Sequence, residues 1–168
     1  MAKIIEGVAR SKGERFGIVV SLFNDFITLR LLRGCLDELS KCGVKKSEVV
    51  VAWVPGAWEI PLVAMRLAHK KNIDAVICLG AVIRGETAHF DLVARGACDG
   101  IQQVSLTTGK PAVLGVLTTK NVNQAYKRSE EKGKNNKGRE AARVAVEMVN
   151  VLAKFKKIIV SNTSMRHY

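Results

Sequence analysis

Short apolar runs alternate along the chain with segments whose apolar residues recur every three or four positions. The runs have the length and β-branched content of strands, and the periodic segments have the spacing of amphipathic helices. Such alternation is typical of a parallel sheet with helices on both faces. We therefore expect a three-layer α/β/α domain around a central four-stranded parallel sheet. The expected strands are residues 15–23, 48–54, 74–83 and 111–117.

The helical segments are expected over residues 24–41, 57–71, 89–107, 121–128 and 138–153, with a polar loop over 129–136. Asn24 or Asp25 can cap the first helix, and Gly43 follows its basic last turn. The buried face of this helix is expected to contain Phe26, Leu29, Leu32, Cys35, Leu36 and Leu39. The buried stripe of the last helix is expected to contain Ala141, Val144, Ala145, Met148 and Leu152.

The chain of 168 residues is long enough for one domain with its own hydrophobic core. We expect that domain to span residues 1–154, followed by a basic tail over 155–168. The longest apolar run, residues 73–83, is too short to cross a membrane. A charged residue interrupts the N-terminal segment before any apolar stretch, so no secretory signal is expected. We therefore expect the protein to stay in the cytoplasm.

The cysteines show no paired or finger-like spacing, and we interpret all of them as reduced and structural. They are Cys35, Cys42, Cys78 and Cys98. Glycines 133 and 138 have the spacing of a phosphate-binding loop, but Arg139-Glu140 replaces the Lys-Ser/Thr pair that such a loop requires. The first strand has no G-x-G-x-x-G after it, and no metal-ligand motif occurs. No cofactor and no metal are therefore expected.

Composition is that of a folded protein, with 48% hydrophobic and 25% charged residues. The net charge of +12 is concentrated at the end of the chain, where residues 120–168 hold 12 Lys and Arg against 4 Asp and Glu. Such an excess raises nucleic acid, a membrane surface or an anionic substrate as partners. A solvated basic face explains most of it. Aromatic residues are only 5% and no nucleic-acid motif is recognised, so nucleic acid is not favoured.

Ligands of open parallel sheets bind at the carboxyl ends of the strands. This rule selects residues 23–24, 55–59, 81–89 and 117–119, the last together with the helix that ends at Arg128. We expect the functional site to lie at these four segments.

The loop 84–89 leads from a strand into a helix, where backbone N–H groups and the helix dipole favour an anion. Gly85 permits close approach of a phosphate, and His89 can carry a proton near neutral pH. An isolated histidine at a helix start is more often a cap or a packed residue. Phe23 and Trp58 could sandwich a flat ring or belong to the core.

Glu59 could bind hydroxyls or cap a helix. Arg128 could clamp a phosphate through its planar fork, or be an ordinary surface arginine.

Several blocks of the sequence, in order and with matching spacing, resemble the lumazine synthase family. They are 23–26 (FNDF), 54–61 (VPGAWEIP), 79–91 (LGAVIRGETAHFD), 115–119 (GVLTT), Gln124-Ala125 with Arg128, 136–138 (NKG) and 140–142 (EAA). The likeness runs from about residue 4 to residue 152. It implies a flavodoxin-like fold whose N-terminal strand adds to a neighbouring subunit.

The resemblance also implies roles for individual residues. The pyrimidine ring would be held by Phe23, Asn24, Ala81, Val82 and Ile83, and its ribityl chain by Ala57, Trp58 and Glu59. The phosphate of the second substrate would be bound by Gly85, Glu86, Thr87 and Arg128, with Lys137 nearby. His89 and Arg128 would be the catalytic residues, His89 as the proton donor. Leu114 and Arg128 would come from the neighbouring subunit.

The implied reaction condenses 5-amino-6-(D-ribitylamino)uracil with 3,4-dihydroxy-2-butanone 4-phosphate to 6,7-dimethyl-8-ribityllumazine, phosphate and water. Many family members have phenylalanine where this chain has Leu114, so the ring would be stacked less. The loop before Lys137 is about one residue longer than usual. A homopentamer is therefore favoured over an icosahedral shell, and riboflavin synthase is a further candidate partner.

Two other functions are compatible with parts of the sequence. A relative that binds lumazine or flavin without catalysis would keep the cleft, but the retention of both His89 and Arg128 favours an enzyme. The hypothesis of a basic shell protein that binds nucleic acid is supported by the net charge alone.

Overall fold

The computed structural model describes the backbone of residues 2–163 and the side chains of residues 2–155. Its strands are β1 (Phe16–Ser21), β2 (Val49–Val54), β3 (Ala75–Ile83) and β4 (Ala112–Thr119). Its helices are α1 (Asp25–Lys41), α2 (Ile60–Ala68), α3 (His89–Thr108), α4 (Val122–Lys127) and α5 (Lys137–Thr163), with 3₁₀ turns at Lys46–Glu48 and Ala57–Glu59.

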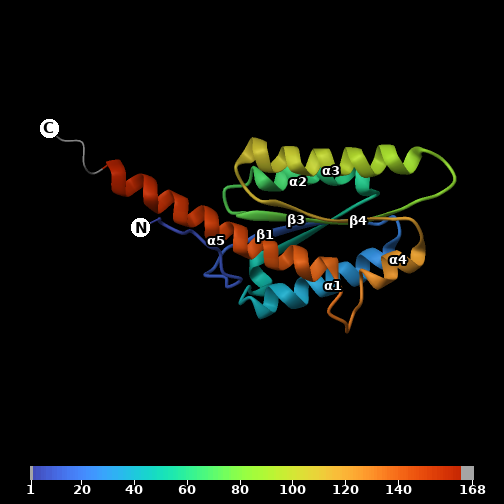
Figure 1. The fold of residues 1–168 in the computed structure, drawn as a ribbon, viewed down its shortest axis with the longest axis horizontal. Coiled ribbons are helices and arrows are strands. Elements are labelled where there is room, and N and C mark those ends of the chain that lie inside the picture. Colours follow the sequence, from blue (N-terminus) through green and yellow to red (C-terminus); the bar gives the residue numbers. More distant parts are fainter. Residues whose placement is uncertain (1, 164–168) are drawn as a thin grey trace.

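The four strands form one parallel sheet in the order β2-β1-β3-β4. Helices α1 and α5 cover one face and α2 and α3 cover the other (Figure 1). Successive residues of β1 point to opposite faces, as the pleat requires: Ile18 and Val20 join the apolar cluster under α1 and α5, and Val19 joins the cluster under α2 and α3. The expected three-layer α/β/α fold is confirmed.

The strand order reverses between β1 and β3. From β1 the chain passes outward to β2, and from β3 it passes outward to β4 on the other side. The connections after β1 and β3 therefore leave in opposite directions and open a crevice at their carboxyl ends, which is where sheets of this topology bind ligands.

The expected inner face of α1 is only half right. Leu32, Cys35 and Leu39 are buried, but Phe26, Leu29 and Leu36 are 42%, 36% and 39% exposed. The helix is instead buried through a neighbouring stripe that packs on both the sheet and α5, made of Ile27, Thr28, Leu31, Gly34 and Glu38 in addition to the three residues above. Periodicity detected two adjacent apolar stripes and could not tell which one faces the core.

The expected stripe of α5 is wrong at two positions. Ala141 and Ala145 are buried, whereas Val144 and Met148 are 43% and 39% exposed and Leu152 is half-buried. Ala142 and Val146 are buried. The buried face of α5 consists mostly of alanines, whose small side chains permit close packing of the helix on the layers beside it.

Asn24 precedes α1 but does not cap it with its side chain. Its backbone is left-handed, with φ of 60°, a conformation that asparagine tolerates better than most residues. The Asn24 carbonyl accepts the first helical N–H groups, from Ile27 and Thr28. The side chain of Asn24 has a different role. Its Nδ2 donates to the Ala81 carbonyl at 2.8 Å, which links the end of β1 to β3.

The N-terminal segment lies beside α5 (Figure 1). Residues 2–15 form no helix or strand in the single chain, and they run beside α5, where Asn150 Nδ2 donates to the Arg10 carbonyl at 3.2 Å. Helix α5 continues to Thr163, past the expected end at residue 153 and into the expected basic tail. Residues 164–168 of that tail lie outside the described residues. Of the helices described, none combines the length and apolarity needed to span a membrane.

Candidate active site

A cleft of about 680 Å³ opens at the carboxyl ends of β1, β2 and β3. Three of the four segments selected by the strand-end rule meet there. Its lining includes most of the candidate residues: Phe23, Ala57, Trp58, Glu59, Ala81, Val82, Ile83, Gly85, Thr87 and His89. Gly56, Phe90, Leu92 and Val93 complete it.

One wall of the cleft is the free edge of β3. Strand β1 pairs with β3 only as far as Val20 opposite Leu79, whereas β3 continues beside β4 to Ile83 opposite Thr119. Residues 80–83 therefore have β4 on one edge and no partner strand on the other, where the Ala81 carbonyl accepts from Asn24 Nδ2 at 2.8 Å and residues 81–83 line the cleft. Alternate N–H and C=O groups on such an edge can bind the polar rim of a flat heterocycle.

Aromatic side chains flank this edge. Phe23 and Trp58 are 70% and 59% exposed, large values for apolar rings. The Phe23 N–H donates to the Pro55 carbonyl at 3.0 Å, which joins the ends of β1 and β2 and fixes the place of the ring. Two exposed rings beside an open polar edge suit a planar ligand, which would gain apolar burial and stacking.

Trp58 lies against a glycine of α3. A Cβ at Gly96 would come within 2.9 Å of the Trp58 ring carbon Cε3 and nearer still to Cζ3. Sequence reasoning missed Gly96. Its signal was a glycine inside a helix, which weakens the helix unless packing requires it.

We expect Gly96→Ala to displace the exposed Trp58 ring and to raise the KM of the ring-bearing substrate several-fold, with a smaller effect on thermal stability. Steady-state kinetics would measure this. Gly100→Ala is the matched control, because a Cβ there meets Pro61, which does not line the cleft. Equal KM values for the Gly96 and Gly100 variants would contradict the role given to the Trp58 contact.

The loop from β3 to α3 is held by an ion pair. Arg84 donates two hydrogen bonds to Asp91, at 3.0 and 2.5 Å, and its guanidinium lies over the Phe90 ring at 4.2 Å. The hydrogen bond from Arg84 lowers the pKa of Asp91. Because a depressed carboxylate pKa contributes stability above the unfolded value, the pair holds at neutral pH and is lost only as the pH falls through the lowered pKa. These contacts join Arg84, at the start of the loop, to the first turn of α3. They thereby limit the positions of the exposed residues between them, Gly85, Glu86, Thr87 and His89.

Five candidate residues do not line the cleft: Asn24, Glu86, Leu114, Arg128 and Lys137. Asn24 acts at its edge through the bond to Ala81. Leu114 lies on the edge strand β4 and is 50% exposed. Among the described residues, the Arg128 guanidinium donates only to the Gln124 carbonyl of α4, and Lys137 pairs with Glu140 at 2.6 Å.

Arg128 and Lys137 are nevertheless adjacent to each other. The Lys137 N–H donates to the Arg128 carbonyl at 2.9 Å, so the loop 129–136 is closed at its base. Asn136, fully buried, ties this base to α1 and α5: its Nδ2 donates to the Arg30 carbonyl at 3.2 Å, and its Oδ1 accepts from the Gly138 N–H at 2.9 Å. The loop predicted as polar is therefore anchored at both ends by the buried residues Ser129 and Asn136.

The cysteines offer no nucleophile to the cleft. None of them lines it. Burial raises the pKa of the Cys35 and Cys78 thiols, to about 12 for Cys78. Across the part of the chain that the structure describes, no cluster of three or more His, Cys, Asp or Glu side chains could hold a metal ion.

Fold and cleft together are those of an α/β protein with an open strand-end cleft lined by exposed aromatic rings and a glycine-containing loop. Comparison with protein families matches residues 13–153 to 6,7-dimethyl-8-ribityllumazine synthase. The chain is also 50% identical over 156 residues to the 6,7-dimethyl-8-ribityllumazine synthase of Desulfatibacillum aliphaticivorans, an alignment that covers 93% of this chain and all of that protein. The chain belongs to the 6,7-dimethyl-8-ribityllumazine synthase family, and it is a transferase of riboflavin biosynthesis.

Proposed function

We propose that the cleft condenses 5-amino-6-(D-ribitylamino)uracil with 3,4-dihydroxy-2-butanone 4-phosphate to give 6,7-dimethyl-8-ribityllumazine. The proposal rests on three features that lie together at the crevice between β1 and β3. They are an apolar space of the size of a ring, a strand edge without a partner strand, and a glycine-containing loop that can bind an anion. Family membership supports the same reaction.

The two substrates occupy different parts of the cleft. The pyrimidine stacks on Phe23 and bonds to the free edge at Ala81, Val82 and Ile83. The segment Ala57-Trp58-Glu59 holds its ribityl chain, with the Glu59 carboxylate accepting hydroxyl protons. The phosphate of the ketone binds the N–H groups of Gly85, Glu86 and Thr87 near the start of α3, where the helix dipole favours negative charge.

The chemistry needs proton transfer and a stabilised leaving group. The pyrimidine amine attacks the ketone carbonyl and forms an imine with loss of water; phosphate then leaves by elimination, and ring closure releases further water. Holding both substrates in one orientation supplies much of the rate. His89 moves protons at the reacting carbon and oxygen atoms, and the anion loop stabilises the departing phosphate.

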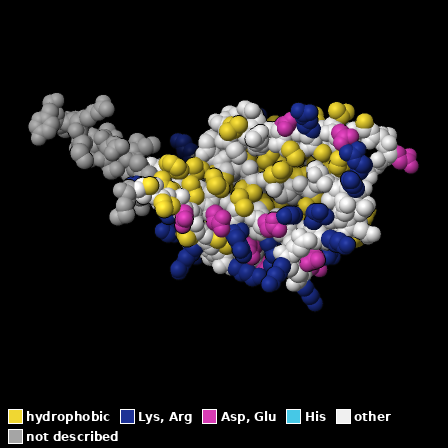
Figure 2. Space-filling model, viewed as in Figure 1, with side chains coloured by type: hydrophobic (Ala, Val, Ile, Leu, Met, Phe, Trp, Pro, Cys, Tyr) yellow, Lys and Arg dark blue, Asp and Glu magenta, His cyan; other side chains and the backbone are white. Residues whose placement is uncertain are grey.

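Assembly is part of the proposal. Apolar side chains that a single chain leaves exposed form a band along the edge strand β4, between α3 and α5, on the face seen in Figure 2. The band includes Leu106, Leu114, Val144 and Met148. We infer that subunits form a homopentamer in which this side meets the cleft of the next subunit, bringing Leu114, Arg128 and Lys137 to it.

The opposite sheet edge supports the same arrangement. Strand β2 is an unpaired edge of the sheet, with Val50 and Trp53 51% and 41% exposed. Uncovered apolar edges pair readily with another strand. We propose that the N-terminal residues of a neighbouring subunit add there. Riboflavin synthase remains a proposed partner on family grounds alone.

An assay with the two purified substrates tests the function, and a mixing experiment tests the shared cleft. Phe23→Asp and Arg128→Ala, each expected to be nearly inactive, are unfolded together and refolded. In a ring of head-to-tail contacts about one quarter of the junctions then combine an intact Phe23 with an intact Arg128, so about a quarter of the native activity should return. Refolding each variant alone is the control. Rings that form normally in the mixture but regain no activity would contradict the shared cleft, while leaving the assay of the native protein to decide the reaction.

A further inference from the structure

A second hollow, separate from the cleft, lies between α1, the loop 129–136 and the first turns of α5. We call it the α1/α5 groove. Its volume is about 670 Å³. The residues that line it are Glu38, Lys41, Lys132, Gly133, Lys134, Arg139, Glu140, Arg143 and Val144, and none of them lines the cleft.

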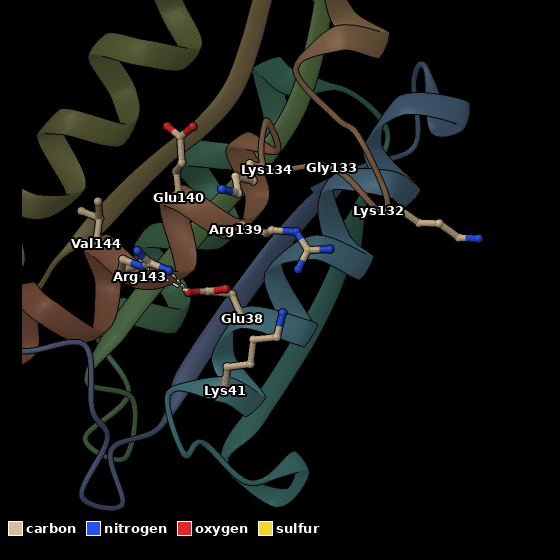
Figure 3. A pocket seen from close by; sticks show the side chains of 9 residues that line it. All are labelled: Glu38, Lys41, Lys132, Gly133, Lys134, Arg139, Glu140, Arg143 and Val144. Atoms are coloured by element: carbon tan, nitrogen blue, oxygen red, sulfur yellow. Dashed lines mark hydrogen bonds and ion pairs between the residues drawn. The ribbon is translucent and has the colours of Figure 1, made fainter.

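Cations of the groove come from both walls. In Figure 3, Lys41 on α1 extends toward the guanidinium of Arg139 on α5, while Arg143 faces Glu38 across the gap. Lys134 lies near the start of α5, and Lys132 points away from the others. Both lysines belong to the loop whose base is closed by the bond from the Lys137 N–H to the Arg128 carbonyl.

The carboxylates present do not balance these cations. Glu38 is engaged by Arg143 at 2.5 Å and Glu140 by Lys137 at 2.6 Å. Asp37, at the rim, is shared by two cations, Lys41 at 2.9 Å and Arg139. Within the described part of the chain, Lys132 and Lys134 form no ion pair. An unneutralised positive charge therefore remains in a concave site, where it is strengthened by the surrounding protein.

Arg139 has an unused donor. Its terminal nitrogens donate to Asp37 and, at 2.7 Å, to the Glu131 carbonyl, but its buried Nε–H has no acceptor among the described residues. That nitrogen is enclosed by protein atoms and both terminal nitrogens are engaged, so Arg139 contributes its positive charge to the groove, and a bond from Nε to a ligand oxygen would require the side chain to move.

The lining also limits the ligand. No aromatic side chain lines the groove, and Val144 is its only large apolar residue, so no surface is available on which a base or ring could stack. The volume is larger than one phosphate group needs, and the cations are spread over both walls. We propose that the α1/α5 groove binds a small anion with two or more phosphate groups and no aromatic ring, at a site outside the lining of the condensation cleft.

Inorganic triphosphate is the probe, and isothermal titration calorimetry of the full-length protein at low salt is the measurement. The test variant is Lys41→Gln/Lys134→Gln, which removes one cation from each side of the groove. The matched control is Lys70→Gln/Lys71→Gln, which removes the same charge from the turn after α2. A third variant, Arg128→Ala, reports binding in the cleft.

The test variant should bind triphosphate about tenfold more weakly or worse, since two charge-assisted contacts are lost. The control and Arg128→Ala should bind it like the native protein, and orthophosphate should bind far less well. Circular dichroism and thermal melting would establish that each variant is folded; if the test variant melts early, Lys134→Gln alone serves, because Lys134 is in an exposed part of the loop.

Three results would overturn the proposal. They are no binding of triphosphate to the native protein, an equal loss in the control pair, and a loss confined to Arg128→Ala. The first of these results, if RNA nevertheless binds, would indicate a surface for polymeric nucleic acid instead.

Discussion

Replacing His89 with alanine is expected to lower kcat by roughly 10²–10⁴-fold, the usual contribution of a general acid–base group. His89 is the first residue of α3, is exposed, and lines the cleft beside Gly85 and Thr87. Its ring is the one histidine side chain among the cleft-lining residues, so no neighbouring imidazole can take over its proton transfer. Single-turnover kinetics, which isolate the chemical steps from product release, would measure the effect.

His69→Ala is the matched control for this variant. His69 caps α2 and its Nδ1 lies 2.8 Å from the Met65 carbonyl, away from the cleft. Activity should be unchanged there. Both variants should assemble and melt like the native protein, because neither histidine is buried. A folded His89→Ala protein with native kcat would remove His89 from the mechanism.

Gly138→Ala is expected to destabilise the protein by on the order of 3 kcal/mol, at the upper end of overpacking effects. A Cβ at Gly138 would lie 2.7 Å from the Leu31 carbonyl carbon and closer still to its oxygen, and backbone cannot rotate away as a side chain can. Helix α5 would have to move off α1, breaking the bond from the Gly138 N–H to Asn136. Thermal denaturation would show a midpoint several degrees lower, given about 2–4 °C per kcal/mol for a chain of this size.

Gly85→Ala serves as the control for folding stability, because no atom lies within 4 Å of a Cβ there. Its melting temperature should equal or slightly exceed the native value, since alanine reduces the freedom of the unfolded chain. Gly138→Ala melting as high as Gly85→Ala would mean that the close approach of α1 and α5 is not obligatory.

Much of the fold followed from the sequence. Residues 75–83 are apolar throughout, as expected of a strand buried on both faces, and β3 is buried from Ala75 to Ala81. The strand-end rule then selected segments 23–24, 55–59 and 81–89 without knowledge of the sheet order, because every parallel strand delivers its following loop to the same edge.

The rest could not follow from periodicity. Phe26 and Leu36 have the spacing of core residues but lie exposed, and a single sequence does not distinguish an apolar stripe facing the sheet from one facing solvent or another subunit. Asn136 looked like an ordinary loop residue, since its bonds to the Arg30 and Glu130 carbonyls depend on long-range packing. The pairing of Arg84 with Asp91 joins loop to helix and has no periodic signature.

The overhang of β3 beyond β1 has a consequence for how this enzyme can change. Under the proposed function, the pyrimidine is recognised there by main-chain groups of residues 80–83, which every amino acid supplies alike. Replacing Val82 or Ile83 by another aliphatic residue leaves those groups in place, so conventional alanine scanning would score the segment as unimportant. Its contribution would become visible only when the backbone itself is altered, for example by an amide-to-ester replacement. The ligand is matched to the path of the chain, while the side chains of Ala81, Val82 and Ile83 are constrained by packing in the core and not by the ligand.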